Sequence, residues 1–245
     1  MTGTTAPVPP TEPALTLDNV AFAWPGGAAV PLDVPHLVLD RGAHTLLLGR
    51  SGSGKTTLLS LICGIVAPQR GNVRVDGIEM AALRPAARDR VRAERIGVIF
   101  QQFNLLPYAS PLDNILLALR FAPERRRRAE RHRDAAAEAR RLGAALGLGD
   151  DVFAARRAAT LSVGQQQRVA AARAMIGSPP LIVADEPTSA LDADSQAAFL
   201  DLLFAQCAEA GATLLMVSHD ARLGAHFERV VDIADLTRPA AEHAA

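Results

Sequence analysis

The segment 49–56, which reads Gly-Arg-Ser-Gly-Ser-Gly-Lys-Thr, constrains the fold of this chain more than any other feature. In a loop of the form G-x-x-x-x-G-K-T, backbone N–H groups turn toward the α- and β-phosphates of a nucleotide, and the lysine reaches the β- and γ-phosphates. Lys55 is the only lysine among 26 basic residues, which suits a position that needs a compact ammonium. An apolar run at 44–48 precedes the loop and a helical pattern at 56–63 follows it. Strand, loop and helix in this order predict a nucleoside triphosphate site at the positive end of the helix.

The charge and cysteine content exclude several classes of protein. The 26 basic and 26 acidic residues give a formal net charge of +0, so we expect no nucleic-acid partner. Cys63 and Cys207 lie in apolar helical patterns and fit neither a disulfide framework nor a metal site, which predicts a reducing cytosolic setting. No uncharged apolar run approaches the ~18 residues that indicate a membrane span, so we expect any membrane role to come through a partner.

The order of apolar runs predicts an α/β protein with a mainly parallel sheet covered by helices. Strand patterns lie at 15–22, 37–39, 44–48, 96–100, 181–184, 213–217 and 230–233, and a hairpin at 72–77 ends in an Asp-Gly turn. A long helix is predicted at 193–210. Residues 1–13 are rich in threonine and proline, which predicts a disordered tail without the apolar core of a signal peptide.

Residues 101–176 differ in amino-acid composition from the rest of the chain. Alanine, leucine and arginine dominate there with helical periodicity, which predicts an inserted helical subdomain. The arginine-rich run 124–133 could be a patch for lipid headgroups or nucleic acid. We favour the exposed face of a helix, because acids at 124, 130, 134 and 138 supply partners at i,i+4 spacing and the net charge is zero.

Two acids follow the apolar run 181–184. Asp185 and Glu186 stand at the end of a buried strand, where open α/β sheets bind their ligands. Asp185 is suited to hold Mg²⁺ through water, and Glu186 can orient or deprotonate the water that attacks a γ-phosphate. Two acids after a strand could also cap a helix, but a phosphate-binding loop on the same sheet favours the catalytic interpretation.

A third motif, Leu-Ser-Val-Gly-Gln at 161–165, begins another helix. The hydroxyl of Ser162 and the backbone N–H groups at that helix start can bind phosphate. The loop at 49–56 already holds the nucleotide of its own chain. A second phosphate-binding helix start therefore makes sense if it covers the nucleotide of another copy.

With these motifs in this order, the chain resembles the ATP-binding-cassette (ABC) family from about residue 15 to 235. The segment 49–56 resembles its Walker A motif, 181–186 its Walker B motif with the catalytic glutamate, and 161–165 its signature motif. Gln101 resembles the glutamine of the Q-loop, 189–192 resembles the D-loop, and His219 resembles the switch histidine. Trp24 stands where the family usually has an aromatic residue that stacks on adenine.

The resemblance implies a P-loop NTPase core with a mainly parallel sheet, an N-terminal antiparallel β subdomain and the inserted helical subdomain. The ATP-binding domain would span 14–237, with its core at about 14–100 and 177–237, the helical subdomain at about 101–176, and tails at 1–13 and 238–245. The resemblance also implies a cytoplasmic protein that is attached to the inner face of the cell membrane through an integral membrane permease.

The family further implies a head-to-tail homodimer that holds and hydrolyses two ATP molecules. Lys55, Glu186 and His219 would be catalytic. Mg²⁺ would be held by Thr56, Gln101 and Asp185. The residues implied to contact ATP are Trp24, Gly49, Arg50, Ser51, Gly52, Ser53, Gly54, Lys55, Thr56, Thr57, Gln101, Ser162, Gly164, Gln165 and Asp192.

The signature departs from the family pattern Leu-Ser-Gly-Gly-Gln at one position, where Val163 replaces the first glycine. A β-branched residue is poorly tolerated at positive φ, so this position either has ordinary backbone angles or strains the motif. Ser162 and Gly164, which would contact the nucleotide, are intact.

The segments 100–107 and 183–192 most resemble the branch of the family that serves macrolide export and lipoprotein release, in which a separate FtsX-like permease transmits force. Polar amino-acid importers share similar residues after position 100, so import is an alternative. Residues 103–108 would either line the groove that receives the permease or belong to the subdomain core.

Two further alternatives are a soluble cassette protein that acts on DNA or ribosomes and a small-molecule phosphotransferase. The lack of a second cassette and of a basic tail argues against the former. The signature motif and His219 argue against the latter.

Overall fold

The computed structural model describes residues 12–27 and 31–238. Its strands are β1 (Leu15–Phe22), β2 (Leu32–Leu39), β3 (His44–Leu48), β4 (Arg70–Val75), β5 (Ile78–Glu79), β6 (Ile96–Ile99), β7 (Leu181–Asp185), β8 (Thr213–Ser218) and β9 (Arg229–Asp232). Its α-helices are α1 (Lys55–Ile62), α2 (Pro85–Arg95), α3 (Pro111–Leu116), α4 (Pro123–Ala129), α5 (Ala135–Ala145), α6 (Asp150–Ala154), α7 (Val163–Met175), α8 (Ala193–Ala210) and α9 (Ile233–Leu236). Short 3-10 turns are η1 (Pro25–Gly27), η2 (Leu117–Leu119), η3 (Ala158–Thr160) and η4 (Ala221–His226). Of the predicted tails 1–13 and 238–245, residues 1–11 and 239–245 lie outside the described residues.

A five-stranded parallel sheet, in the order β6-β7-β8-β3-β9, forms the centre of the fold. Successive residues of a strand face opposite sides of a sheet. Along β7, Ile182 and Ala184 therefore face one apolar core while Leu181 and Val183 face another. Strands buried on both faces read as continuous apolar runs, which is why these strands could be predicted from the sequence. The predicted α/β fold is confirmed.

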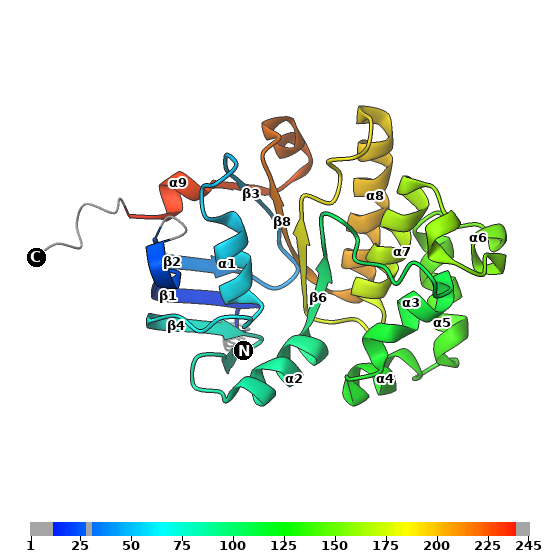
Figure 1. The fold of residues 1–245 in the computed structure, drawn as a ribbon, viewed down its shortest axis with the longest axis horizontal. Helices are drawn as coiled ribbons and strands as arrows, with labels where there is room; N and C mark the ends of the chain where they lie inside the picture. The colour runs from blue at the N-terminus through cyan, green and yellow to red at the C-terminus, as the bar shows by residue number, and fades with distance from the viewer. Residues whose placement is uncertain (1–11, 28–30, 239–245) are drawn as a thin grey trace, which may run out of the picture.

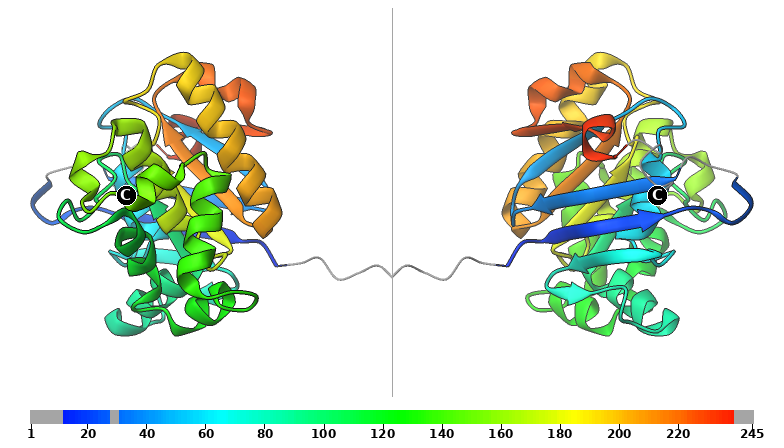
Figure 2. Two further views of the ribbon diagram at one scale, coloured as in Figure 1. Left: turned by 90° about the vertical axis from the view of Figure 1, so that its right-hand side faces the viewer. Right: turned by 90° about the vertical axis from the view of Figure 1, so that its left-hand side faces the viewer.

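The two cores lie on opposite sides of this sheet. Helices α3, α5, α7 and α8 cover one side, and α1 covers the other, where it separates the parallel sheet from a second one (Figure 1). The second sheet is four-stranded and antiparallel, in the order β2-β1-β4-β5, and it faces the viewer in the right-hand view of Figure 2. Leu58 and Ile62 of α1 share a core with Leu17 of β1 and Val183 of β7.

The register of the parallel strands brings several loops to one edge of the sheet. Leu48 of β3 lies beside Ser218 of β8, and Asp185 of β7 lies beside Val217 of β8. Strand β6 pairs with β7 up to Ile99. The segments that follow β3, β6, β7 and β8 therefore leave the sheet side by side at its carboxyl edge, where open α/β sheets bind their ligands.

The structure lengthens one predicted strand and adds helix α2, which the sequence did not indicate. Strand β2 begins at Leu32 and not at residue 37, because Asp33 and Pro35 interrupt its apolar pattern and an edge strand tolerates proline. Helix α2 is strongly polar, with Glu94 as its only buried residue, so no apolar periodicity marked it. Helices α3 to α7 lie within 101–176, while the exact subdomain boundaries stay a prediction.

The arginine-rich run 124–133 is only in part the exposed helix face that its pattern predicts. Arg126 is exposed and pairs with Glu130 at 3.2 Å in the expected i,i+4 arrangement. Arg125, in contrast, is 3% exposed, so the prediction is wrong for this residue. Helix α4 packs against α2 and α5, and a run of consecutive arginines does not reveal which of them turns inward.

Gly97 lets β6 approach α7 closely, because a Cβ at this position would lie 2.0 Å from the backbone oxygen of Ala174. We predict that Gly97→Ala lowers the free energy of unfolding by about 3 kcal/mol, since the strand or the helix must shift in a packed core. Gly164→Ala is the control, because nothing lies within 4 Å of a Cβ there. Urea denaturation without nucleotide measures both, and equal stability of the two variants would contradict the close approach.

Candidate nucleotide site

The loop after β3 leads into the N-terminal end of α1. Gly52 and Gly54 have φ values of +80° and +96°, which residues with a Cβ rarely adopt. No side chain caps α1, so its first-turn N–H groups are left for another acceptor. Free N–H groups and the helix dipole make this end of α1 suited to bind an anion.

A cavity of about 430 Å³ opens above this loop. Its volume lies within the roughly 300–1,000 Å³ of small-molecule sites. The cavity collects residues from the loops after β3, β6, β7 and β8, and each of them had been predicted for the site from the sequence. They are Arg50, Ser51, Gly52, Gly54, Lys55, Thr56, Thr57, Gln101, Asp185, Glu186 and His219.

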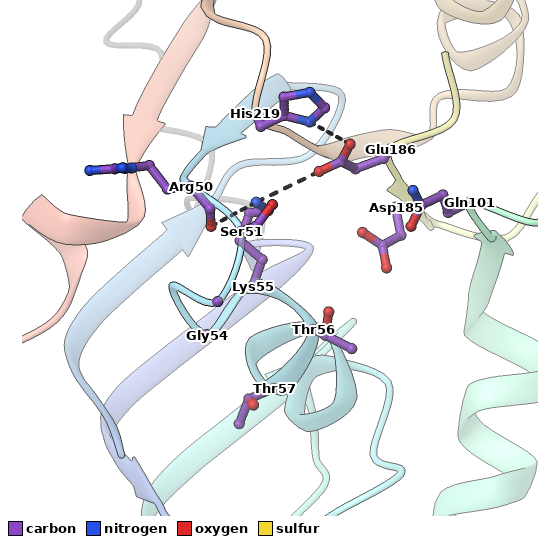
Figure 3. A pocket seen from close by; sticks show the side chains of 11 residues that line it. Arg50, Ser51, Gly54, Lys55, Thr56, Thr57, Gln101, Asp185, Glu186 and His219 are labelled. Atoms are coloured by element: carbon purple, nitrogen blue, oxygen red, sulfur yellow. Dashed lines mark hydrogen bonds and ion pairs between the residues drawn. The ribbon is translucent and has the colours of Figure 1, made fainter. Parts of the chain in front are cut away.

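Lys55, Glu186 and His219 form one polar chain across the cavity (Figure 3). Lys55 Nζ lies 3.6 Å from Glu186 Oε1, and His219 Nδ1 lies 2.6 Å from Glu186 Oε2. Lys55 Nζ also donates to the backbone oxygens of Gly49 and Arg50. Glu186 has a φ of +44°, an uncommon conformation for a residue other than glycine, and such backbone strain clusters at functional sites.

Asp185, Gln101 and Thr56 face the same part of the cavity in Figure 3. Burial raises the pKa of the Asp185 carboxyl above its ordinary value, and the negative charge of Glu186 raises it further, while Lys55 opposes both. A cation beside Asp185 would relieve this penalty. The carboxylate, amide and hydroxyl oxygens of these residues are hard donors of the kind that Mg²⁺ prefers, so they fit the predicted ion.

The described residues contain no group of three or more His, Cys, Asp or Glu that could hold a metal ion. An ion between Asp185, Gln101 and Thr56 would therefore need further oxygen ligands, which nucleotide phosphates and water supply in sites of this kind.

Trp24 borders the loop without lining the cavity. Its Nε1 donates to Thr57 Oγ1 at 3.0 Å, and its ring meets the Phe22 ring edge-on with centroids 5.1 Å apart. These contacts hold the indole beside the first turn of α1. Gly49 and Ser53 likewise belong to the loop but not to the residues that line the cavity.

The signature residues lie outside the cavity. Ser162 caps α7, where the Gln165 N–H donates to Ser162 Oγ at 3.2 Å and the Ser162 N–H donates to Gln165 Oε1 at 3.0 Å. Both residues thus stabilise the helix start, and neither they nor Gly164 contribute to the cavity of their own chain. Ser162 is exposed, so it is free to meet another molecule.

Asp192 also lies outside the cavity, at the start of α8. Its carboxylate accepts from the Ser195 N–H at 2.9 Å and from Ser195 Oγ at 3.0 Å. These hydrogen bonds lower the pKa of the Asp192 carboxyl below its ordinary value. The residue is therefore a helix cap within its own chain.

Val163 is the first residue of α7 and has helical backbone angles, so the alternative of an ordinary backbone is right. We predict that Val163→Gly changes ATP turnover by no more than a few-fold, because the valine side chain is 48% exposed and strains nothing. Steady-state phosphate release measures this. A much larger change would mean that the valine tunes the site through a contact outside this chain.

Comparison with known proteins agrees with this geometry. Residues 32–189 match the family model described as ABC transporter. The chain belongs to the ABC transporter family. The protein is therefore an ABC ATPase, a cassette that binds and hydrolyses ATP.

Three relatives illustrate the match. The lipoprotein-releasing system ATP-binding protein LolD of Anaeromyxobacter dehalogenans is 39% identical over 93% of this chain and 93% of its own length. The macrolide export ATP-binding/permease protein MacB of Rhodopirellula baltica is 38% identical over 81% of this chain but only 28% of its own length. The dimeric post-hydrolysis structure of the cassette MJ0796 with ADP and Pi superposes with a TM-score of 0.72 at 34% identity, covering 89% of this chain and 93% of that one.

This ABC ATPase is therefore an ATP-binding subunit of the LolD and MacB type, as the sequence predicts. Within residues 12–27 and 31–238, the structure has no helix with the length and apolar character needed to cross a membrane.

Proposed function

We propose that this ABC ATPase acts as a head-to-tail homodimer that closes on two ATP molecules and drives a separate membrane permease. The observation that carries this proposal is that the predicted ATP-binding residues lie in two separate places on the chain's surface. Lys55 and Glu186 lie in the cavity, whereas Ser162 lies outside it at the exposed start of α7. A second copy would bring its own Ser162 onto the nucleotide. MJ0796, a relative of similar fold, has a dimeric structure with ADP and Pi.

In this dimer, each ATP is held mainly by the loop and the first turn of α1. On this side, Trp24 lies against the base. The residues that surround the phosphates are Gly49, Arg50, Ser51, Gly52, Ser53, Gly54, Lys55, Thr56 and Thr57. The partner copy adds its Ser162, Gly164, Gln165 and Asp192. ATP favours the closed dimer because its γ-phosphate contacts both copies, and hydrolysis removes that preference.

Thr56, Gln101 and Asp185 would hold Mg²⁺, which would neutralise negative charge on the nucleotide phosphates. Glu186 accepts a proton from the attacking water, and His219 is held in place through its hydrogen bond to Glu186. Lys55 leaves its contacts with Glu186 and the loop carbonyls when a γ-phosphate offers stronger charge-assisted bonds. ATP binding thereby frees one oxygen of Glu186 for the water.

The domain that carries out this reaction spans 14–237, with a helical subdomain at about 101–176. Because it reaches the membrane through its permease, it acts at the inner face of the cell membrane. No nucleic acid takes part, in keeping with the formal net charge of +0.

The permease docks in a groove of about 560 Å³ between α2, β6 and η2. Phe121, which is 72% exposed, and Phe100 stand at this groove, where Arg92 pairs with Asp89 and Arg90 adds a positive charge. Such a surface fits a short cytoplasmic helix with an apolar face and acidic ends. The MacB relative carries ATP-binding and permease functions in one protein, and this chain matches only 28% of its length.

The groove differs from the segment 103–108 that the sequence suggested. Phe103 is buried, so the alternative of a core position is right for this residue. Phe121 was missed because a lone phenylalanine in a stretch of alanine and arginine carries no signal of exposure.

A pull-down of the tagged Glu186→Gln protein from detergent-solubilised membranes with MgATP tests the proposal. We expect a membrane permease with a large extracytoplasmic domain to accompany it. A permease found together with a solute-binding protein would instead indicate an importer. Ribosomes or DNA-repair proteins without any membrane protein would contradict the transport function.

A Phe121→Arg variant in the Glu186→Gln background tests whether the permease docks in this groove. It should lose the permease and keep ATP-driven dimerisation, since Phe121 does not line the nucleotide cavity. Capture of the permease at the level of the parent would contradict the docking position.

A further inference from the structure

The guanidinium of Arg125 is buried, and all three of its nitrogens donate hydrogen bonds. Its Nε donates to the backbone oxygen of Ile176 at 2.6 Å, and its Nη1 donates to those of Ala93 at 3.3 Å and Ile96 at 3.4 Å. Its Nη2 donates to the backbone oxygens of Arg173 and Ala174. A guanidinium has five N–H donors, and here each one meets a backbone carbonyl.

These carbonyls belong to two places in the fold. Ala93 and Ile96 lie where α2 ends and β6 begins, whereas Arg173 and Ala174 lie in the last turn of α7. The last carbonyls of a helix lack partners within the helix and carry partial negative charge, so a cation satisfies them well. Arg125 therefore connects the end of α7 to the start of β6 through one rigid, planar group.

The far ends of both elements reach the proposed ATP site. Strand β6 leads into Gln101, and Ser162 caps the first turn of α7. We propose that Arg125 is a positioning residue, which fixes the orientation of α7 against β6 so that Ser162 meets the ATP held by the partner copy. This inference depends on the proposed head-to-tail dimer.

The surroundings of Arg125 are built to hold it in this position. The Glu94 carboxylate accepts from the backbone N–H groups of Glu124 at 3.0 Å and Arg125 at 2.7 Å. Arg128 donates to the backbone oxygens of Gly177 and Glu94, both at 2.8 Å. Helix α4 is thus tied to α2 at its start and, through Arg128 in its last turn, to the segment after α7, independently of the Arg125 guanidinium.

Two glycines allow the close packing that Arg125 requires. A Cβ on Gly97 would meet the backbone oxygen of Ala174, and a Cβ on Gly177 would lie 2.4 Å from the backbone oxygen of Arg125. Burial, with a smaller effect of Arg128, lowers the pKa of Arg125 to about 9, while Glu94 opposes this, so the group is still charged at neutral pH.

A small tilt of α7 about its C-terminal end, where Arg125 contacts it, would move Ser162 at the other end by a larger distance, because the helix is long. Its 13 residues span about 20 Å, so a tilt of roughly 5° about its C-terminal end moves Ser162 by about 2 Å. A misplacement of about 1 Å at a reacting group can lower a rate by roughly 100-fold. A residue that only stabilised the fold would change the amount of folded protein and not the rate of the folded enzyme.

The test compares Arg125→Met and Arg125→Lys with Arg126→Met. Arg126 lies on the same helix and pairs with Glu130 on the surface, so it controls for the loss of one arginine. For each purified full-length variant, the folded fraction, the ATP affinity of the monomer and kcat are measured. The same substitutions in the Glu186→Gln background report MgATP-driven dimerisation by light scattering.

We expect Arg125→Met to lower kcat per folded molecule roughly tenfold and to weaken dimerisation, with monomer ATP affinity unchanged. Arg125→Lys should be intermediate, because an ammonium has three donors and cannot satisfy both helix ends. It also keeps the test valid if the methionine variant does not fold. Arg126→Met should match the parent.

Two results would overturn the inference in distinguishable ways. If the Glu186→Gln parent dimerises and both Arg125 variants keep its dimerisation and a wild-type kcat, Arg125 has no positioning role. If the Glu186→Gln parent itself stays monomeric with MgATP, the proposed dimer fails, and the inference that depends on it fails too.

Discussion

Glu186→Gln is expected to lower ATP turnover at least ~100-fold while ATP still binds, because positioned general bases contribute about 10²–10⁴-fold. Glutamine keeps the shape of the side chain and the hydrogen bond to His219 but cannot accept the proton of the attacking water. The cavity lacks a second carboxylate in an equivalent place, since Asp185 faces Gln101 and Thr56. Phosphate release measures turnover, and titration with a fluorescent nucleotide measures affinity.

Glu209→Gln is the matched control, because that glutamate pairs with Arg141 on the surface away from the cavity. It should turn over ATP at the wild-type rate. A Glu186→Gln protein that keeps more than a tenth of the wild-type turnover would show that another group activates the water.

Lys55→Ala is expected to raise the Kd for ATP by roughly 30- to 150-fold, because charge-assisted hydrogen bonds contribute about 2–3 kcal/mol. Lys55 is 8% exposed and stands at the end of the loop that surrounds the phosphates in the proposed complex. Calorimetric titration of ATP measures the change, and thermal unfolding shows whether the loop still folds without its lysine.

The Lys55→Arg variant tests whether ATP binding needs the shape of the ammonium in addition to its charge. Arginine is the basic residue that this chain uses everywhere else, yet its larger, planar guanidinium does not suit the buried position at the end of the loop, where a compact ammonium lies. We expect it to bind ATP nearly as poorly as Lys55→Ala. Arginine with wild-type affinity would show that charge alone matters at this position.

The nucleotide site could be predicted from the sequence because its residues are fixed by local motifs. The loop before Lys55 and the acids after β7 each carry their chemistry in adjacent residues. Parallel strands buried on both faces then bring their carboxyl ends to one edge, which gathers Glu186 and His219 without further information. The residues of the loop and the two acids could be named in this way, whereas Gln101 and His219 were named through the resemblance to the ABC family.

Other features depend on contacts that no local pattern encodes. Helix α2 packs against β6 and α4. Its own sequence is polar, so it has no apolar periodicity from which a helix could be predicted. Arg125 looked like its neighbours in an arginine run, and only the meeting of two helix ends decides that it turns inward. The backbone angles of Val163 likewise follow from the Ser162 cap and not from the residue type.

The central claim is that one ATP lies between the P-loop of one copy and the signature helix of another. Chemical cross-linking of Arg50→Cys chains mixed with Val163→Cys chains, all carrying Glu186→Gln, tests it most directly. Arg50 and Val163 are both exposed, so both thiols are accessible. The native Cys63 and Cys207 are buried and should react little.

With MgATP and a short bis-maleimide, we predict covalent dimers that contain one chain of each kind, and none without nucleotide. Arg126→Cys in place of Arg50→Cys should give no such dimer, because Arg126 lies on α4 away from the loop. Mixed dimers that form only in MgATP would establish the head-to-tail arrangement. Links only between like residues, or no links at all with MgATP, would contradict it.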